Sequence, residues 1–227
     1  MRTLFSTLQK VVPQHGLSRL AGAIASNETP WLRKTIIEQF ARVYNVSLDE
    51  AERSELSDYR NFNDFFTRAL KPGARPIAAD KQTIVSPADG AVSQSGRIDR
   101  DQLMQAKGHT YTLSSLAGRL GRGCENGSFC TVYLAPSDYH RVHLPFSGTL
   151  TETLAVPGEL FSVNSSTEQA IEGLFARNER LVCRFETEFG PMLVVLVGAM
   201  IVASIETDWL GPTSPYTEEE HSEHHLV

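Results

Sequence analysis

Apolar residues within positions 1–45 recur three and four residues apart, in three successive stripes. The stripes consist of Leu4, Phe5, Leu8, Val11 and Val12; of Leu17, Leu20, Ala21 and Ile24; and of Leu32, Ile36, Ile37, Phe40 and Val43. This spacing predicts amphipathic helices. Pro13 separates the first two stripes, and Thr29 followed by Pro30 is typical of the N-cap and first residue of a helix.

From residue 84 onward, short stretches rich in β-branched and aromatic residues alternate with Gly, Pro, Asn and Asp. Examples are residues 83–85, 128–134, 149–156, 181–185 and 192–205. Strands at such short spacing predict a mainly antiparallel β-sandwich or a partly open barrel. With the N-terminal helices added, the predicted fold class is α+β.

Charge is distributed unevenly along the chain. Residues 1–42 carry six basic and two acidic side chains, whereas residues 206–227 carry six acidic side chains and no Lys or Arg. Basic helices with aromatic residues such as Phe5 and Trp31 can lie in an anionic membrane surface. The same stripes can instead pack on the domain that follows, and the pattern alone leaves both interpretations open.

Three regions follow from these patterns. Residues 1–75 are predicted to be helical, basic and associated with a membrane surface, and residues 76–208 to form a β-rich domain. Residues 209–227 begin with Gly and Pro and continue with acidic residues and histidines, so we expect an acidic, disordered tail.

The composition of the chain argues against several classes of protein. Hydrophobic residues make up 41% of the chain, enough for a packed core, and 21 basic against 27 acidic side chains argue against nucleic-acid binding. We find neither a signal peptide nor the roughly 18 apolar residues that a membrane-spanning helix needs. Cys124, Cys130 and Cys183 include no C-x-x-C pair, so we expect a reducing compartment and no structural zinc site.

Two short segments combine titratable residues with turn signals. Asp89 lies in a Ser-Pro-Ala-Asp-Gly turn, where Asp before Gly is also common for backbone reasons alone, and His140 and His143 follow Pro136. On a helical turn the two imidazoles would share one face, whereas on a strand they would point to opposite faces. An Asp and a His can form the orienting half of a nucleophilic triad. The three residues could instead bind a metal ion, although their spacing is not that of H-E-x-x-H.

Several longer segments carry a family pattern when they are taken together. These are residues 65–72 (FFTRALKP), 75–77 (RPI), 86–90 (SPADG), 105–108 (QAKG), 138–143 (DYHRVH), 157–164 (PGELFSVN), 174–180 (LFARNER) and 189–192 (FGPM), the last leading into 197–199 (VGA). In colinear order over about residues 1–210, they resemble the bacterial, membrane-associated phosphatidylserine decarboxylase family.

This resemblance implies a pyruvoyl enzyme of phospholipid biosynthesis, a lyase that converts phosphatidylserine to phosphatidylethanolamine and CO2. In that family the substrate amine forms a Schiff base with the pyruvoyl group, which takes up the electrons of the departing carboxylate. The group arises when a proenzyme cuts itself at a Gly-Ser bond. Matched position by position, Asp89 and His143 are the acid and base that activate the serine, and His140 assists decarboxylation.

The self-cleavage motif of the family, Leu-Gly-Ser-Thr, has no counterpart in this sequence. The Gly127–Ser128 dipeptide belongs to another segment, and Pro212 stands where Leu210–Thr213 would need a serine. We therefore expect the pyruvoyl group on a separate small chain, with this chain as the large-chain part. A catalytically silent or lipid-binding relative is the alternative, and a metal-dependent hydrolase using Asp89, His140 and His143 is a third hypothesis. If the missing segment contributes strands, the remaining sheet is expected to have an exposed edge and an incomplete core, and the apolar stretch at 192–205 is the element most vulnerable to aggregation.

The family context also implies partners and a location. The expected partners are phosphatidylserine, a membrane surface, the pyruvoyl-bearing small chain and a second copy in a homo-oligomer. The expected location is the cytoplasmic face of the cell membrane, with peripheral attachment through the basic helices.

Overall fold

The computed structural model describes residues 14–78, 83–200, 202, 204–213, 216 and 218–226. The first predicted helical stripe lies outside these residues. The chain forms two compact units, each described here by itself. Unit 1 takes its described residues from 1–20, 92–131 and 147–227, and unit 2 from 21–91 and 132–146. The site residues Asp89, His140 and His143 all belong to unit 2.

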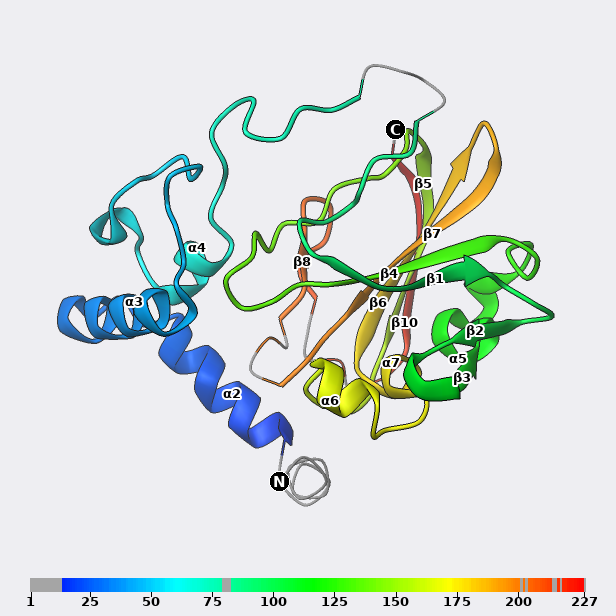
Figure 1. Cartoon of the computed structure of the whole chain (residues 1–227), viewed down its shortest axis with the longest axis horizontal. Helices are drawn as coiled ribbons and strands as arrows, with labels where there is room; N and C mark the ends of the chain where they lie inside the picture. The colour runs from blue at the N-terminus through cyan, green and yellow to red at the C-terminus, as the bar shows by residue number, and fades with distance from the viewer. Residues whose placement is uncertain are drawn as a thin grey trace. The chain divides into compact units, whose positions relative to one another are not determined.

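Unit 1 is built on a four-stranded antiparallel sheet in the order β10-β5-β6-β7 (Figure 1). Its strands are β5 (Thr149–Val156), β6 (Arg180–Thr187), β7 (Gly190–Val197) and β10 (Glu220–Leu226). Three two-stranded sheets accompany it: β1 (Ala91–Arg97) with β4 (Ser128–Tyr133), β2 (Gln102–Met104) with β3 (Thr110–Thr112), and β8 (Glu206–Thr207) with β9 (Gly211–Pro212). With the helices of both units, this confirms the predicted α+β class.

Both faces of the four-stranded sheet bury apolar side chains. Leu154 and Val182 on one face join a core that includes residues of the short helices α5 (Leu113–Ala117), η3 (Gly118–Gly121) and α7 (Leu174–Arg177). Leu150 and Leu181 belong to the core on the other face, with Tyr216. Leu150 and Leu154 would share a face in a regular strand, but a β-bulge between Leu150 and Glu152 reverses the alternation. Two further short helices are η2 (Ala106–Gly108) and α6 (Ser165–Glu168).

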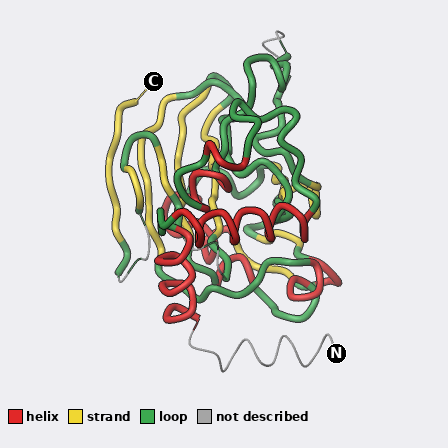
Figure 2. The backbone as a smooth tube through the Cα atoms, turned by 90° about the vertical axis from the view of Figure 1, so that its left-hand side faces the viewer, coloured by secondary structure: helices red, strands yellow, loops and turns green. Residues whose placement is uncertain are grey.

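The C-terminal tail differs from the disordered segment that its composition predicts. Residues Glu220–Leu226 form β10, which pairs with β5 and is the outermost strand of the sheet in Figure 2. His221 lies 3.0 Å from the Glu152 carboxylate, and His224 Nε2 lies 2.9 Å from Thr153 Oγ1. Pairing with a sheet edge satisfies the backbone N–H and C=O groups of a mainly polar segment, so low hydrophobicity does not exclude a strand here. The predicted strand at 192–205 ends at Val197, and β7 forms the opposite outer edge.

Unit 2 is built around helix α3 (Pro30–Tyr44), which begins after Thr29 as its capping pattern predicts. Its other helices are the end of α2 (Gln14–Ala25), η1 (Leu56–Asp58) and α4 (Phe62–Phe66). Ile37, Tyr59 and Phe65 form the buried core of this unit. Val43, a member of the predicted apolar stripe, is 70% exposed, so only part of the stripe is buried.

Candidate active site

Two segments far apart in sequence carry the predicted site residues and run beside each other in unit 2. The amide of Val85 donates to the carbonyl of Pro145 at 3.0 Å, and the amide of His143 donates to the carbonyl of Pro87 at 2.8 Å. These two bonds join the turn that contains Asp89 to the segment that contains both histidines. The fold therefore brings the three residues into one region of one unit.

Gly90 allows this close approach. A Cβ atom at position 90 would lie 2.2 Å from the carbonyl oxygen of Tyr133, a distance that real Cβ atoms do not show. Glycine is therefore required by backbone packing at the position after Asp89, where the chain passes close to Tyr133 at the end of β4. The common Asp-Gly turn signal here reflects a tertiary contact as well as a turn.

The Asp89 carboxylate is bound by Arg75. Arg75 Nε lies 2.9 Å from both oxygens of Asp89, and Nη2 lies 2.5 Å from Oδ2. The same guanidinium donates to both oxygens of Glu50, each at 2.9 Å. Hydrogen bonding to Arg75 lowers the pKa of Asp89, so this carboxylate stays ionised at neutral pH.

His143 is held by an aromatic neighbour. Its Nε2 lies 2.9 Å from the hydroxyl oxygen of Tyr139, and the two rings stack with centroids 5.6 Å apart and an interplanar angle of 18°. Among the described contacts, the Asp89 carboxylate bonds to Arg75 and not to His143. The structure thus places the predicted acid and base on neighbouring segments, each with its own partner.

His140 is less exposed to solvent than His143. Its Nδ1 lies 2.9 Å from the carbonyl oxygen of Asp138, and its ring packs on Phe66 with centroids 3.9 Å apart. A carbonyl only accepts, so Nδ1 carries the proton and Nε2 of the neutral ring is basic. Burial lowers the pKa of His140; the bond to Asp138 opposes this effect and the charge of Arg68 adds to it.

Arg68 holds the backbone of the segment that contains the histidines. This side chain is buried, and its Nη2 donates to the carbonyls of Ser137 and Asp138 at 2.8 and 3.3 Å. The Asp138 carbonyl therefore accepts from both Arg68 and His140. These contacts fix the backbone from which the His140 ring projects.

The segment around the histidines is neither of the two alternatives predicted from sequence. Residues 136–138 form a turn, and residues 139–144 have no regular secondary structure. His140 contacts Phe66 of α4, whereas His143 contacts Tyr139 of its own segment. The two imidazoles therefore have separate surroundings.

The metal-site hypothesis finds no support in this arrangement. Within the part of the chain that the structure describes, no group of three or more His, Cys, Asp or Glu side chains is placed to hold a metal ion. Asp89, His140 and His143 do not converge as a ligand set.

The sequence predicted the three titratable residues but missed Arg75, Tyr139, Arg68 and Phe66 as their partners. All four lie in segments of the family pattern, where they had no assigned role beyond being members of a motif. Tyr139 precedes His143 by four residues, a spacing that is informative on a helix but not in the irregular segment observed here.

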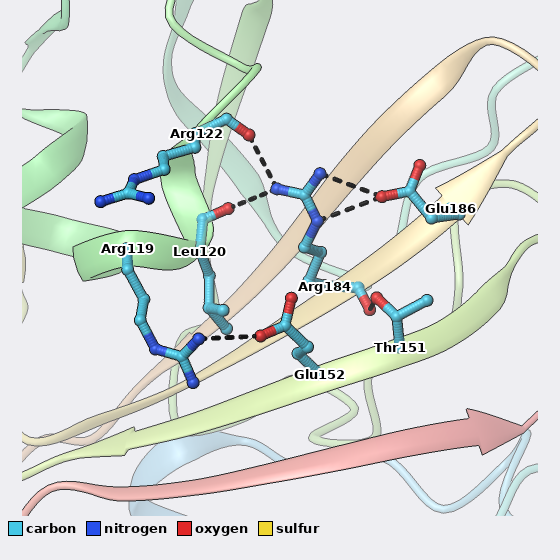
Figure 3. A pocket seen from close by; sticks show the side chains of 7 residues that line it. All are labelled: Arg119, Leu120, Arg122, Thr151, Glu152, Arg184 and Glu186. Atoms are coloured by element: carbon cyan, nitrogen blue, oxygen red, sulfur yellow. Dashed lines mark hydrogen bonds and ion pairs between the residues drawn. The ribbon is translucent and has the colours of Figure 1, made fainter.

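A separate groove of about 400 Å³ lies in unit 1 (Figure 3). Its lining residues are Arg119, Leu120, Arg122, Thr151, Glu152, Arg184 and Glu186. Arg184 donates to two backbone carbonyls and pairs with Glu186, while Arg119 pairs with Glu152. None of the predicted site residues lines this groove, whose charges largely neutralise one another.

Comparison with known proteins identifies the family. A family model described as phosphatidylserine decarboxylase matches residues 62–224, and another, described as PSD, matches residues 4–45. The chain is 54% identical over 220 residues to the phosphatidylserine decarboxylase proenzyme of Alcanivorax borkumensis, covering 95% of this chain and 76% of that protein. It is 52% identical over 227 residues to the proenzyme of Acinetobacter baumannii, covering 99% and 80%.

The chain therefore belongs to the phosphatidylserine decarboxylase family, as the motifs predicted. The proenzyme of Saccharophagus degradans, 52% identical over 219 residues, is a further relative. The family match continues to residue 224, beyond residue 210 where the resemblance was expected to end, and so includes most of β10. The family is one of decarboxylases, enzymes of the carboxy-lyase class.

Proposed function

We propose that this chain is the large-chain part of a phosphatidylserine decarboxylase, which converts phosphatidylserine to phosphatidylethanolamine and CO2. The observation that carries the proposal is the placement of Asp89, His140 and His143 on two hydrogen-bonded segments of one unit, in a chain of this family. Loss of CO2 leaves an electron pair on the α-carbon, and that carbon must then receive a proton.

His140 is the residue best suited to this proton transfer. Its Nδ1 is committed to the Asp138 carbonyl, so Nε2 is the atom that accepts and returns a proton. Because burial beside Phe66 lowers its pKa, the neutral ring can take a proton from the substrate ammonium group at neutral pH. Once protonated, the same atom is a strong acid toward carbon.

His143 and Asp89 are proposed to serve the self-cleavage that the proenzyme names of the relatives imply. His143 Nε2 would accept the proton of the nucleophilic serine hydroxyl. Asp89, kept ionised by Arg75, would stabilise the imidazolium that results.

The residues present fit a pyruvoyl group. Such a group needs a proton-exchanging partner in a site that restricts water, and the half-buried His140 with its basic Nε2 beside Phe66 provides both. When bound through a partner small chain, the pyruvoyl group supplies the electron sink for cleavage of the carboxylate bond. His140 would lie toward it and hold the proton that the product receives.

Peripheral attachment to the cytoplasmic face of the cell membrane is part of the proposal. Helix α2 exposes the apolar stripe of Leu17, Leu20 and Ile24, and Trp31 at the start of α3 is 70% exposed. This exposure favours insertion into a lipid surface over packing on a protein core. Among the described residues, no helix has the length and apolar character needed to cross a bilayer.

The test is CO2 release from phosphatidylserine labelled at its carboxylate, in mixed micelles, by protein purified with all chains that accompany it in its own cells. Turnover that is lost in His140→Gln supports the proposal, and an intact-mass spectrum should show a second chain with a blocked N-terminus. Absence of CO2 release from that complete preparation would overturn it and leave a catalytically silent relative.

A further inference from the structure

The contact between Tyr139 and His143 determines where the His143 proton lies. Each partner of the pair has one hydrogen when the imidazole is neutral. Either the Tyr139 hydroxyl donates to Nε2 and the ring proton is on Nδ1, or Nε2–H donates to the hydroxyl oxygen. Both arrangements fit the 2.9 Å distance between the Tyr139 hydroxyl oxygen and His143 Nε2. Only the first leaves Nε2 without a proton and so able to act as a base.

Burial distinguishes the two arrangements. Tyr139 is 9% exposed, and within the described part of the chain its hydroxyl has one hydrogen-bond partner, His143. If Nε2–H were the donor, the hydroxyl hydrogen of this buried residue would have no acceptor there, which is costly. If the hydroxyl donates, the Nδ1–H group of the exposed His143 can bond to water. The arrangement in which the Tyr139 hydroxyl donates therefore satisfies both hydrogens.

The residue that usually fixes the tautomer of such a histidine is engaged elsewhere. In a Ser-His-Asp arrangement the carboxylate holds the Nδ1–H form. Here the Asp89 carboxylate accepts three contacts from Arg75, whose other side is held by Glu50. Tyr139 approaches the imidazole from the opposite nitrogen and can impose the same form.

We propose that Tyr139 is a positioning residue that donates to His143 Nε2 and holds the imidazole as the Nδ1–H tautomer. The ring stacking fixes the plane of the imidazole, and the hydroxyl marks Nε2 as its basic atom. An incoming serine hydroxyl would replace the tyrosine hydroxyl at a nitrogen that is already deprotonated. This role rests on the proposed function of His143 as the base of self-cleavage.

The tautomer can be measured directly. In the full chain labelled with 15N-histidine, the shifts of Nδ1 and Nε2 in the neutral ring report which nitrogen carries the proton, and loss of one signal set in His143→Gln assigns them. We expect the wild-type ring mainly as Nδ1–H. In Tyr139→Phe, which keeps the ring stack, the ratio of Nδ1–H to Nε2–H should fall roughly three- to tenfold, the factor that one ordinary hydrogen bond gives.

Tyr44→Phe removes a hydroxyl from an exposed helical residue of the same unit and should leave the ratio unchanged. A wild-type ring found mainly as Nε2–H, or a ratio that Tyr139→Phe does not alter, would overturn the proposal. If Tyr139→Phe fails to fold, 3-fluorotyrosine placed at 139 keeps the contact with a stronger donor, and the ratio should rise; no rise also overturns it.

The outcome is independent of decarboxylation. A ring held as Nδ1–H in a protein that releases no CO2 would support the inference about Tyr139 and contradict the proposed function. An active enzyme in which Tyr139→Phe leaves the His143 tautomer unchanged would support the proposed function and contradict the inference about Tyr139.

Discussion

Arg75 determines the state of the Asp89 carboxylate, because it donates to both oxygens of that group. In Arg75→Ala the pKa of Asp89 should rise from its lowered value toward the ordinary carboxyl range. A lowered folded-state pKa contributes stability at neutral pH that is lost as the pH falls through it, so wild type should lose more stability on acidification than the variant. The pair is partly exposed, so the difference should stay below about 1 kcal/mol.

Carboxyl-detected NMR titration measures this pKa, and urea unfolding at neutral and at acidic pH measures the stability. Glu50→Gln is the matched control, because it leaves the Arg75–Asp89 contact in place and should keep the pKa of Asp89 low. An Asp89 pKa that is the same in Arg75→Ala and in wild type contradicts this account of the site.

Phe66 has the corresponding effect on His140. Burial is the largest cause of the lowered His140 pKa, and the Phe66 ring lies 3.9 Å from the imidazole. Phe66→Ala should therefore raise the pKa of His140, and the acid limb of CO2 release should move to higher pH. Phe189→Ala, which removes an exposed ring from the β6–β7 turn, is the control. If the pKa of His140 is unchanged in Phe66→Ala, groups other than Phe66 shield the imidazole from solvent.

At the residue scale, the titratable site residues can be predicted from the sequence, but the side chains that contact them cannot. A carboxylate in a Gly-containing turn and two closely spaced histidines can be found from residue types alone. Arg75 contacts Asp89 across 14 residues and Glu50 across 25 residues, which no local pattern encodes. The tautomers of both histidines likewise depend on partners that only the folded chain supplies.

Among the elements, the turn at residues 86–90 depends strongly on a single residue, Gly90. Gly90→Ala would place a methyl group 2.2 Å from the Tyr133 carbonyl oxygen, and either the turn or its partner segment must move. We expect a destabilisation of about 2 kcal/mol or more and a weakened hold on Asp89. Gly22→Ala in α2 is the matched control, because nothing lies within 4 Å of its new Cβ. That change should stabilise the helix by about 0.5–1 kcal/mol. Thermal unfolding of both variants measures the contrast, and equal melting temperatures would disprove it.

The sequence pattern predicted helices α2 and α3 and strands β4 to β7, whereas residues 83–85 are not a strand. Two features of the sheet also could not be predicted from it. The β-bulge in β5 transfers Leu150 to the opposite face, although its spacing from Leu154 fits a regular strand. Strand β10 consists mainly of acidic residues and histidines, and its order comes from pairing with β5. Local composition reports neither cross-strand register nor the presence of an available edge.

Taken as a whole molecule, the chain combines a buried sheet core with helices whose apolar residues are partly exposed. Unit 1 buries side chains on both faces of its sheet, while Leu17, Leu20 and Ile24 of α2 are 40–59% exposed. Exposed apolar residues on one helix are typical of a surface that binds a partner or a membrane. For an enzyme proposed to act on a phospholipid, a membrane surface is the expected partner.

Replacing these three residues with Gln should therefore weaken binding to vesicles of mixed zwitterionic and anionic lipid by at least about tenfold, since each side chain loses apolar area that the membrane would cover. Stability should change by less than about 0.5 kcal/mol per site, because the side chains are already exposed. Phe189→Gln, an equally polar change at an exposed site of unit 1, should leave vesicle binding intact. Co-sedimentation at low and high salt measures both effects, and salt should weaken the electrostatic part of the binding. If the triple variant co-sediments as well as wild type, helix α2 does not attach the protein to the membrane, and its exposed stripe must serve another contact.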